Sequence, residues 1–125
     1  MAISQLRSRR KASGGRYIDF RKKKLRELGN LPRLTKLGEQ KKVSLRVRAG
    51  NKKTVLLRQN IANVFDPKSK KYDKLKILTI VDNPANRHFI RRNIITRGAI
   101  IKTEKGNAKV LNRPGQEGMI NAVLV

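Results

Sequence analysis

The sequence contains no cysteine, no tryptophan and a single histidine, and only 8 of its 125 residues are acidic. Without cysteine the chain forms no disulfide and no thiolate-ligated metal site, which is typical of a reducing compartment. His88 has no second imidazole to share a metal with, so the spacing of histidine metal sites is absent as well. We therefore expect neither a bound metal nor a cofactor.

The acidic residues are too scattered to indicate a catalytic site. They stand at positions 19, 27, 39, 66, 73, 82, 104 and 117, and none lies within one helical turn or one strand step of another. General acid–base chemistry by a local carboxylate pair is therefore not expected. We predict no catalytic residue, no enzyme activity and no small-molecule substrate, and we interpret His88 as a surface or loop residue, with an RNA contact as the second interpretation.

Long apolar runs are also missing. No segment approaches the roughly 20 apolar residues that span a bilayer. The first ten residues carry three arginines and lack the apolar stretch of a secretory signal. We expect no membrane association and a cytoplasmic location.

Positive charge is what the sequence has in excess. The 32 Lys and Arg residues give a formal net charge of +24, and a compact state with this charge repels itself unless a polyanion neutralises it. Nucleic acid, an anionic membrane surface and an acidic protein all satisfy that demand, so the charge alone does not choose among them.

The composition changes near residue 42. Residues 1–42 hold 14 Lys and Arg, 3 acids and only two Val or Ile residues, whereas residues 43–125 hold 17 Val and Ile. The first part has too little apolar surface to offset the entropy of ordering its backbone. We predict a largely non-globular, basic RNA-binding extension over 1–42, followed by a β domain over 43–125.

The extension concentrates its charge between residues 7 and 26, where ten cations occur. Residues 21–27 are compatible with one or two helical turns that end at Gly29, although four consecutive cations favour that helix only when phosphates are bound. Gly14 and Gly15 interrupt the run. Either they allow a sharp bend close to phosphates, or they form a flexible linker; the sequence favours neither.

Short strands fill the rest of the chain. Val43, Leu45 and Val47 alternate with Ser44, Arg46 and Arg48, so we expect the apolar residues to face the core and the two arginines to face RNA. A turn at 49–52, in which Gly50 and Asn51 can take positive φ, leads to a second strand over 54–58. Further strands are predicted over 61–65, 74–81, 99–103, 108–111 and 119–125, while 87–93 fits a helical turn or a strand.

These elements predict an all-β fold, a small barrel of six to seven strands that closes and so leaves no exposed edge. A two-sheet sandwich is the alternative.

Two short patterns resemble nucleotide- or RNA-binding motifs, but each is better explained as a turn. Residues 50–54 lack the earlier glycine of a phosphate loop and are followed by a strand where that loop needs a helix. Residues 115–118 match the glycine pattern of an RNA clamp, yet they carry a carboxylate and have no flanking helices. The five aromatic residues form no closely spaced pair within a strand, so base stacking is not expected to be the main binding mode.

Electrostatic recognition of phosphates remains, with arginine favoured as the residue that positions them, because its planar fork binds in a bidentate way. The candidate RNA-binding residues are Arg7, Arg9, Arg10, Lys11, Gly14, Gly15, Arg16, Arg21, Lys22, Lys23, Lys24, Arg26, Arg33, Lys36, Lys41, Lys42, Arg46, Arg48, Asn51, Lys52 and Lys53.

Several ordered motifs together resemble the archaeal and eukaryotic small-subunit ribosomal protein family S8e, over nearly the whole chain. The matching segments are 10–15 (RKASGG), 27–29 (ELG), 34–38 (LTKLG), 47–51 (VRAGN), 83–86 (NPAN), 96–100 (TRGAI) and 113–116 (RPGQ). The short length is similar to that of the archaeal members. Two positions depart from the family pattern: Asn30 stands where arginine is usual, and Ala49 where a second glycine is usual.

The resemblance implies a structural constituent of the small ribosomal subunit that binds ribosomal RNA, with neighbouring ribosomal proteins as partners and no homo-oligomer. Two rival classes stay open. A nucleic-acid chaperone would share the charge but bind DNA and RNA alike, and an enzyme acting on RNA would need carboxylates, or a carboxylate and His88, to converge in the fold.

Overall fold

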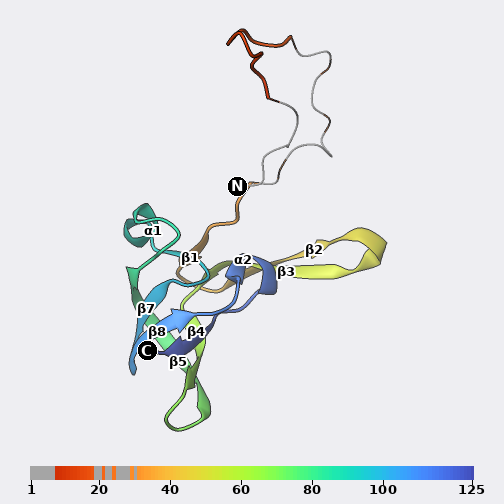
Figure 1. Cartoon of the computed structure of the whole chain (residues 1–125). Coiled ribbons are helices and arrows are strands. Elements are labelled where there is room, and N and C mark those ends of the chain that lie inside the picture. Colours follow the sequence, from red (N-terminus) through yellow and green to blue (C-terminus); the bar gives the residue numbers. More distant parts are fainter. Residues whose placement is uncertain (1–7, 19–20, 22–23, 25–28, 30) are drawn as a thin grey trace. The chain divides into compact units, whose positions relative to one another are not determined.

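The computed structural model describes residues 8–18, 21, 24, 29 and 31–125 (Figure 1). The chain divides into two compact units, residues 1–32 and 33–125. This division falls earlier than residue 42, because the segments 35–37 and 41–46 are strands of the second unit. The helix predicted over 21–27 lies mostly outside the described residues.

The second unit, in which every residue is described, consists almost entirely of short strands. It contains β1 (Thr35–Leu37), β2 (Lys41–Arg46), β3 (Lys52–Gln59), β4 (Ile61–Asp66), β5 (Lys71–Asp82), β6 (Ile94–Ile95), β7 (Ile100–Thr103), β8 (Gly106–Val110) and β9 (Asn121–Leu124). Two one-turn helices, α1 (His88–Arg91) and α2 (Pro114–Glu117), interrupt them. No helix among the described residues is long and apolar enough to cross a membrane.

Five of these strands close into a barrel in the order β4-β5-β7-β8-β9. Neighbours are antiparallel except β4 and β9, which pair in parallel. Strands that alternate in direction around a ring of five must begin and end in the same direction, so closure requires one parallel pair. The all-β small barrel is confirmed, but the ring has five strands rather than six or seven, because the remaining four form a sheet of their own.

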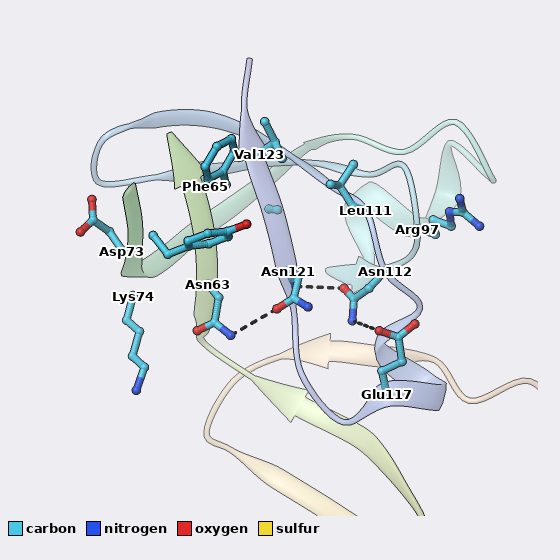
Figure 2. A pocket seen from close by; sticks show the side chains of 12 residues that line it. Asn63, Phe65, Asp73, Lys74, Arg97, Leu111, Asn112, Glu117, Asn121 and Val123 are labelled. Carbon is cyan, nitrogen blue, oxygen red and sulfur yellow. Dashed lines mark hydrogen bonds between the residues drawn. The ribbon is translucent and has the colours of Figure 1, made fainter. Parts of the chain in front are cut away.

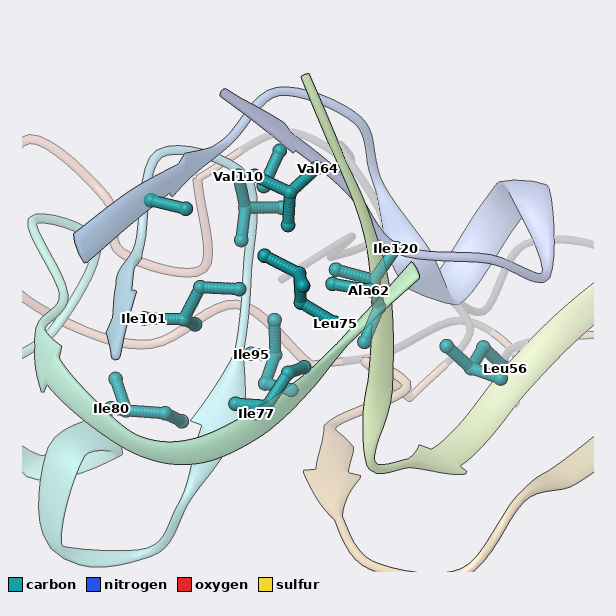
Figure 3. Packing of buried hydrophobic residues seen from close by; sticks show 12 residues of the cluster. Leu56, Ala62, Val64, Leu75, Ile77, Ile80, Ile95, Ile101, Val110 and Ile120 are labelled. Atoms are coloured by element: carbon teal, nitrogen blue, oxygen red, sulfur yellow. The ribbon is translucent and has the colours of Figure 1, made fainter. Parts of the chain in front are cut away.

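Alternation along the barrel strands supplies the core. Ala62 and Val64 of β4, Ile101 of β7 and Val110 of β8 are at most 1% exposed and belong to one apolar cluster (Figure 3). Burying a valine or isoleucine side chain stabilises the fold by about 1.5 to 3 kcal/mol relative to leaving it in water. The cluster explains why the barrel forms from strands of only four to twelve residues.

Strand β5 interrupts its alternation to follow the barrel wall. Its register with β7 shifts between Ile77 and Thr79 and again between Ile80 and Asp82. Such bulges bend a strand and increase its twist. As a result Ile77 and Ile80, three positions apart, both point into the core, while Leu78 between them is exposed.

The other four strands form a sheet in the order β2-β3-β1-β6. Leu56 of β3 and Ile95 of β6 belong to the same apolar cluster as the barrel residues, so this sheet packs against the barrel. Strands β1 and β6, of three and two residues, were not predicted. Segments this short show no periodicity, and only their pairing with β3 and with each other makes them strands.

The hairpin between β2 and β3 turns through two residues with positive φ, Ala49 (φ 60°) and Gly50 (φ 75°). We expected Gly50 and Asn51 to take that role, which is wrong for Asn51, whose φ is −61°. A pair of left-handed residues matches the right-handed twist of a hairpin. Ala49 takes the left-handed conformation that glycine adopts at lower cost, which gives a physical reason for a second glycine at this position.

The segment 87–93, which fitted either a helical turn or a strand, contains the one-turn helix α1. The buried side chain of Asn83 joins the residues on either side of this segment: its Nδ2 donates to Ile94 O (3.1 Å), and its Oδ1 accepts from Ala85 N (3.1 Å) and Thr96 Oγ1 (2.9 Å). His88 is exposed, as predicted for a surface or loop residue.

Helix α2 packs closely on β3, and a side chain would not fit at its C-cap Gly118 and would be crowded at Gly115. A Cβ on Gly118 would lie 2.7 Å from Thr54 Cγ2, and one on Gly115 would lie 3.2 Å from Arg33 O. The glycine pattern at 115–118 is therefore explained by packing.

Candidate nucleic-acid interface

The first basic segment, Ser8 to Ile18, folds back on itself. Arg10 and Arg16 form an antiparallel bridge, and backbone N–H groups of Lys11 and Tyr17 donate to Gly15 O (2.7 Å) and Arg9 O (3.0 Å). Gly14 has φ +84°, which L side chains rarely adopt. The backbone therefore bends sharply at these glycines, and the close approach of phosphates to the bend stays a prediction.

The four cations of this turn are all exposed, but two of them also contact the turn itself. The guanidinium of Arg10 donates to Gly14 O at 3.0 Å, and the ammonium of Lys11 lies 5.7 Å from the centre of the Tyr17 ring. Arg9 and Arg16 complete the set. The turn thus presents positive charge on a backbone whose direction is fixed by its own hydrogen bonds.

Other predicted residues of the first unit are less well defined. Arg7, Lys22, Lys23 and Arg26 lie outside the described residues, and Arg21 and Lys24 are exposed.

In the second unit the predicted residues lie on β1, β2 and β3, just before β1, or in the turn between β2 and β3, and Figure 1 shows the β2–β3 hairpin projecting beyond the barrel. Arg33, Lys36, Lys41, Lys42, Arg46, Arg48, Asn51 and Lys52 are exposed, and Lys53 is half-buried. Lys53 is also tied to helix α2, because its ammonium donates to Gln116 Oε1. Between residues 40 and 65 the chain has seven Lys and Arg and no Asp or Glu.

Strand register sorts these cations into rows. Arg46 lies opposite Lys52 near the tip of the hairpin. Nearer the barrel, Arg58 lies opposite both Lys41 and Lys36, so three cations cross three strands. Like charges directly opposite one another destabilise a sheet. We call these two rows the cationic rows of the hairpin.

Arg58 is a residue that sequence reasoning missed. It belongs to a mostly apolar strand, and its neighbours along the chain gave no signal. The parallel pairing of β1 with β3 brings it beside Lys36.

The apolar side of β2 does not reach the core. Val43 and Leu45 are half-buried, Val47 is 39% exposed, and none of the three belongs to the core cluster. The prediction that they face the core is wrong for Leu45 and Val47, because the hairpin extends past the barrel that would have covered them, whereas Val43 lies outside the core cluster but opposite Val55, which is buried. Arg46 does alternate with them as expected, whereas Arg48 lies in the turn at Arg48–Gly50 rather than on the strand.

Known proteins resemble this chain over its whole length. A family model described as ribosomal protein S8e matches residues 4–125. The chain belongs to the ribosomal protein S8e family.

Two relatives are similar to this chain over nearly their whole length. It is 52% identical to small ribosomal subunit protein eS8 of Methanococcus aeolicus over 126 residues, which cover 100% of this chain and 98% of that protein. It is 46% identical to small ribosomal subunit protein eS8 of Picrophilus torridus over 125 residues, which cover 100% of both chains. The chain thus has nearly the same length as these two archaeal proteins, in agreement with the similarity in length noted from the sequence. Membership of a ribosomal protein family also confirms that it is not an enzyme.

The S8e fold brings further exposed cations together outside the predicted set. Arg87, Arg91 and Arg92 lie in and beside helix α1 and are exposed. Sequence reasoning left this segment without a role because its conformation was ambiguous. The described residues contain no group of three or more His, Asp or Glu side chains that could hold a metal.

The outer wall of the barrel has an open groove with a volume of about 910 Å³. Two rows of side chains from β5, β4 and β9 line it. We call them the aromatic row (Tyr72, Phe65, Val123) and the amide row (Lys74, Asn63, Asn121), and in each row the residues are strand partners. Beyond the amide row, Asn112 joins the groove through its Oδ1, which accepts from Asn121 N at 2.9 Å (Figure 2).

Proposed function

We propose that this protein is a structural constituent of the small ribosomal subunit and that it binds ribosomal RNA by contacting phosphates. The cationic rows of the hairpin carry the proposal. In each row cations lie opposite one another with no acid on the same strands, an arrangement that costs stability in the free protein. Phosphates between the cations would turn that repulsion into attraction.

The turn at Ser8–Ile18 is proposed as a second contact. Its backbone reverses at Gly14, and Arg9 and Arg16 are exposed beside the reversal. Arginine binds phosphate through two parallel N–H bonds, which fixes direction as well as charge. Arg10 is expected to stabilise the turn rather than to bind phosphate, since its guanidinium already donates to Gly14 O.

All candidate residues of the extension, including those outside the described ranges, are proposed to serve this one function. Neighbouring ribosomal proteins are proposed as further partners, in the cytoplasm and without a homo-oligomer. The relatives' names and the family along the full chain support a place in the small subunit.

Competition binding tests this function against a general nucleic-acid chaperone. We expect small-subunit ribosomal RNA to displace random duplex DNA, and the protein to stay with small subunits during sedimentation in high salt. A chaperone held by charge alone would bind both nucleic acids equally and would wash off.

The salt dependence of affinity tests the mechanism. If about ten phosphates are neutralised, log affinity falls against log salt with a slope on the order of −7 to −9. Deletion of residues 1–26 is expected to flatten the slope greatly. An unchanged slope would assign the charge contacts to the β domain alone.

A further inference from the structure

The groove on the barrel wall is unlike the cationic rows, because it combines aromatic, amide and charged groups. Phe65 and Tyr72 lie opposite each other on β4 and β5, with ring centres 4.8 Å apart and ring planes tilted by 42°. Tyr72 is 76% exposed. An aromatic ring with a largely free surface, backed by a second ring, is what a nucleic-acid base stacks on.

The amide row offers hydrogen bonds next to these rings. Residues two apart on a strand share a face, so Asn63 lies on the same outer face as Phe65. Asn63 Nδ2 donates to Asn121 Oδ1 at 3.2 Å. Within residues 31–125 this leaves Asn63 Oδ1, the second N–H of Asn63 Nδ2 and both N–H groups of Asn121 Nδ2 without a partner. An acceptor beside a donor complements the edge of a base.

The charge that remains available in the groove is positive. Of its two acids, Asp73 is paired, since its Oδ2 lies 2.6 Å from the Lys105 ammonium. Glu117 Oε2 accepts from the neutral amide of Asn112 at 3.2 Å, so Glu117 keeps its charge, and the two cations Lys74 and Arg97 outnumber it. Lys74 and Arg97 have no ion-pair partner in the second unit, and Figure 2 shows them toward opposite ends of the groove.

We propose that this groove binds an unpaired nucleotide of an RNA strand. The base stacks on Tyr72 and Phe65, Asn63 and Asn121 hydrogen-bond its edge, and Lys74 and Arg97 contact the phosphates on either side. The proposal rests on the proposed RNA-binding function and adds to it a site that recognises a base rather than a backbone. Sequence reasoning did not expect stacking, since the two rings come from different strands and meet only through their register.

A short segment of a neighbouring protein is the competing occupant. The available groups favour RNA, because two unpaired cations suit phosphates and the exposed ring needs a flat partner. A protein occupant is nevertheless a distinct outcome of the experiment.

The experiment uses the full chain and a short single-stranded RNA that carries 2-aminopurine, whose fluorescence falls when it stacks on an aromatic ring. The wild type is expected to quench the probe. Tyr72→Ala is expected to abolish the quenching and to weaken binding on the order of 5- to 100-fold, with the salt slope unchanged. Tyr72→Phe, which keeps the ring, is expected to retain both the quenching and the affinity of the wild type.

Leu78→Ala is the matched control, since Leu78 lies exposed on the same strand but outside the groove lining. Its quenching and affinity are expected to equal those of the wild type. Asn63→Ala is expected to retain stacking but to reduce the discrimination between bases. Because Tyr72 is largely exposed, its substitution leaves the barrel core intact.

The outcomes separate this proposal from the one it rests on. Salt-dependent RNA binding by the wild type without any quenching would overturn the groove proposal and leave the phosphate contacts standing. Quenching that depends on Tyr72, together with equal affinity for duplex DNA, would support the groove and overturn the ribosomal function. If Tyr72→Ala binds RNA normally but fails to join subunits assembled with the other ribosomal proteins, the groove belongs to a protein neighbour.

Discussion

Arg46 lies directly opposite Lys52 across the β2–β3 hairpin, and no carboxylate lies on either strand to separate the two charges. In the free protein this pair lowers the free energy of unfolding by roughly 0.2 to 1 kcal/mol. Its place near the tip of a hairpin that extends past the barrel makes the cost understandable if a polyanion lies there in the working complex. We therefore expect this pair to affect both the stability of the free protein and its binding to RNA.

Replacing both residues by glutamine is expected to stabilise the free protein and to weaken its binding to RNA. Chemical unfolding followed by circular dichroism is expected to show a gain of up to about 1 kcal/mol. The salt slope of RNA binding is expected to lose about 1.4 to 1.8, the share of two phosphate contacts. A double variant of Lys68 and Lys70, exposed in the β4–β5 turn, removes the same charge elsewhere. If both double variants lost the same amount of salt slope, a local phosphate contact at the hairpin would be refuted.

Ala49→Gly is expected to stabilise the protein. Ala49 has φ 60° at the hairpin tip, where an L side chain costs about 1 to 2 kcal/mol. Part of the gain is offset by the greater freedom of glycine in the unfolded chain, so a net gain of about 0.5 to 1 kcal/mol is expected. Gly50→Ala, at the neighbouring left-handed position, is the reciprocal variant and is expected to lose about 1 kcal/mol. Unfolding in urea measures both, and a destabilised Ala49→Gly variant would show that this turn conformation is not the native one.

Gly118→Ala is expected to be among the most damaging single-methyl additions. The new Cβ would lie 2.7 Å from Thr54 Cγ2, and φ is +71°. Overpacking and backbone strain together predict a loss of about 2 to 4 kcal/mol. Thr54→Ser removes the clashing methyl and is expected to recover the packing part of the loss in a double-mutant cycle. Additive effects of the two substitutions would contradict the close contact. Gly14→Ala, where no atom lies within 4 Å, isolates the cost of the backbone alone.

The acid limb of the stability curve is expected to depend on Asp66. The backbone N–H of Lys68 and the hydroxyl of Ser69 donate to its carboxylate and lower its pKa from 3.8. A pKa that is lower in the folded state contributes stability above 3.8, and this contribution disappears as the pH falls through the folded value. Asp66→Asn keeps an acceptor but cannot titrate. Its stability difference from the wild type is expected to be constant near neutral pH and to vanish in strong acid, as measured by unfolding at a series of pH values.

Much of the fold could be read from local patterns. The hairpins of β2 with β3 and of β7 with β8 follow from turn residues flanked by short apolar runs, which act over neighbouring residues. The division of strands between a barrel and a sheet could not be read in this way. It depends on the parallel pairs β1–β3 and β4–β9, and parallel partners are far apart in the sequence.

For the candidate interface, too, some features could be predicted from the sequence and others could not. The basic composition, the scarcity of acids and the S8e motifs are properties of the sequence itself, and by themselves they indicated a polyanionic partner and the family. The tertiary structure alone decided which side chains are neighbours: Arg58 beside Lys36 and Lys41, Tyr72 beside Phe65, and Val47 beyond the reach of the core. The physical reason is strand register, since pairing across strands is set by closure of the barrel and by packing of the four-stranded sheet against it rather than by the neighbours of a residue along the chain.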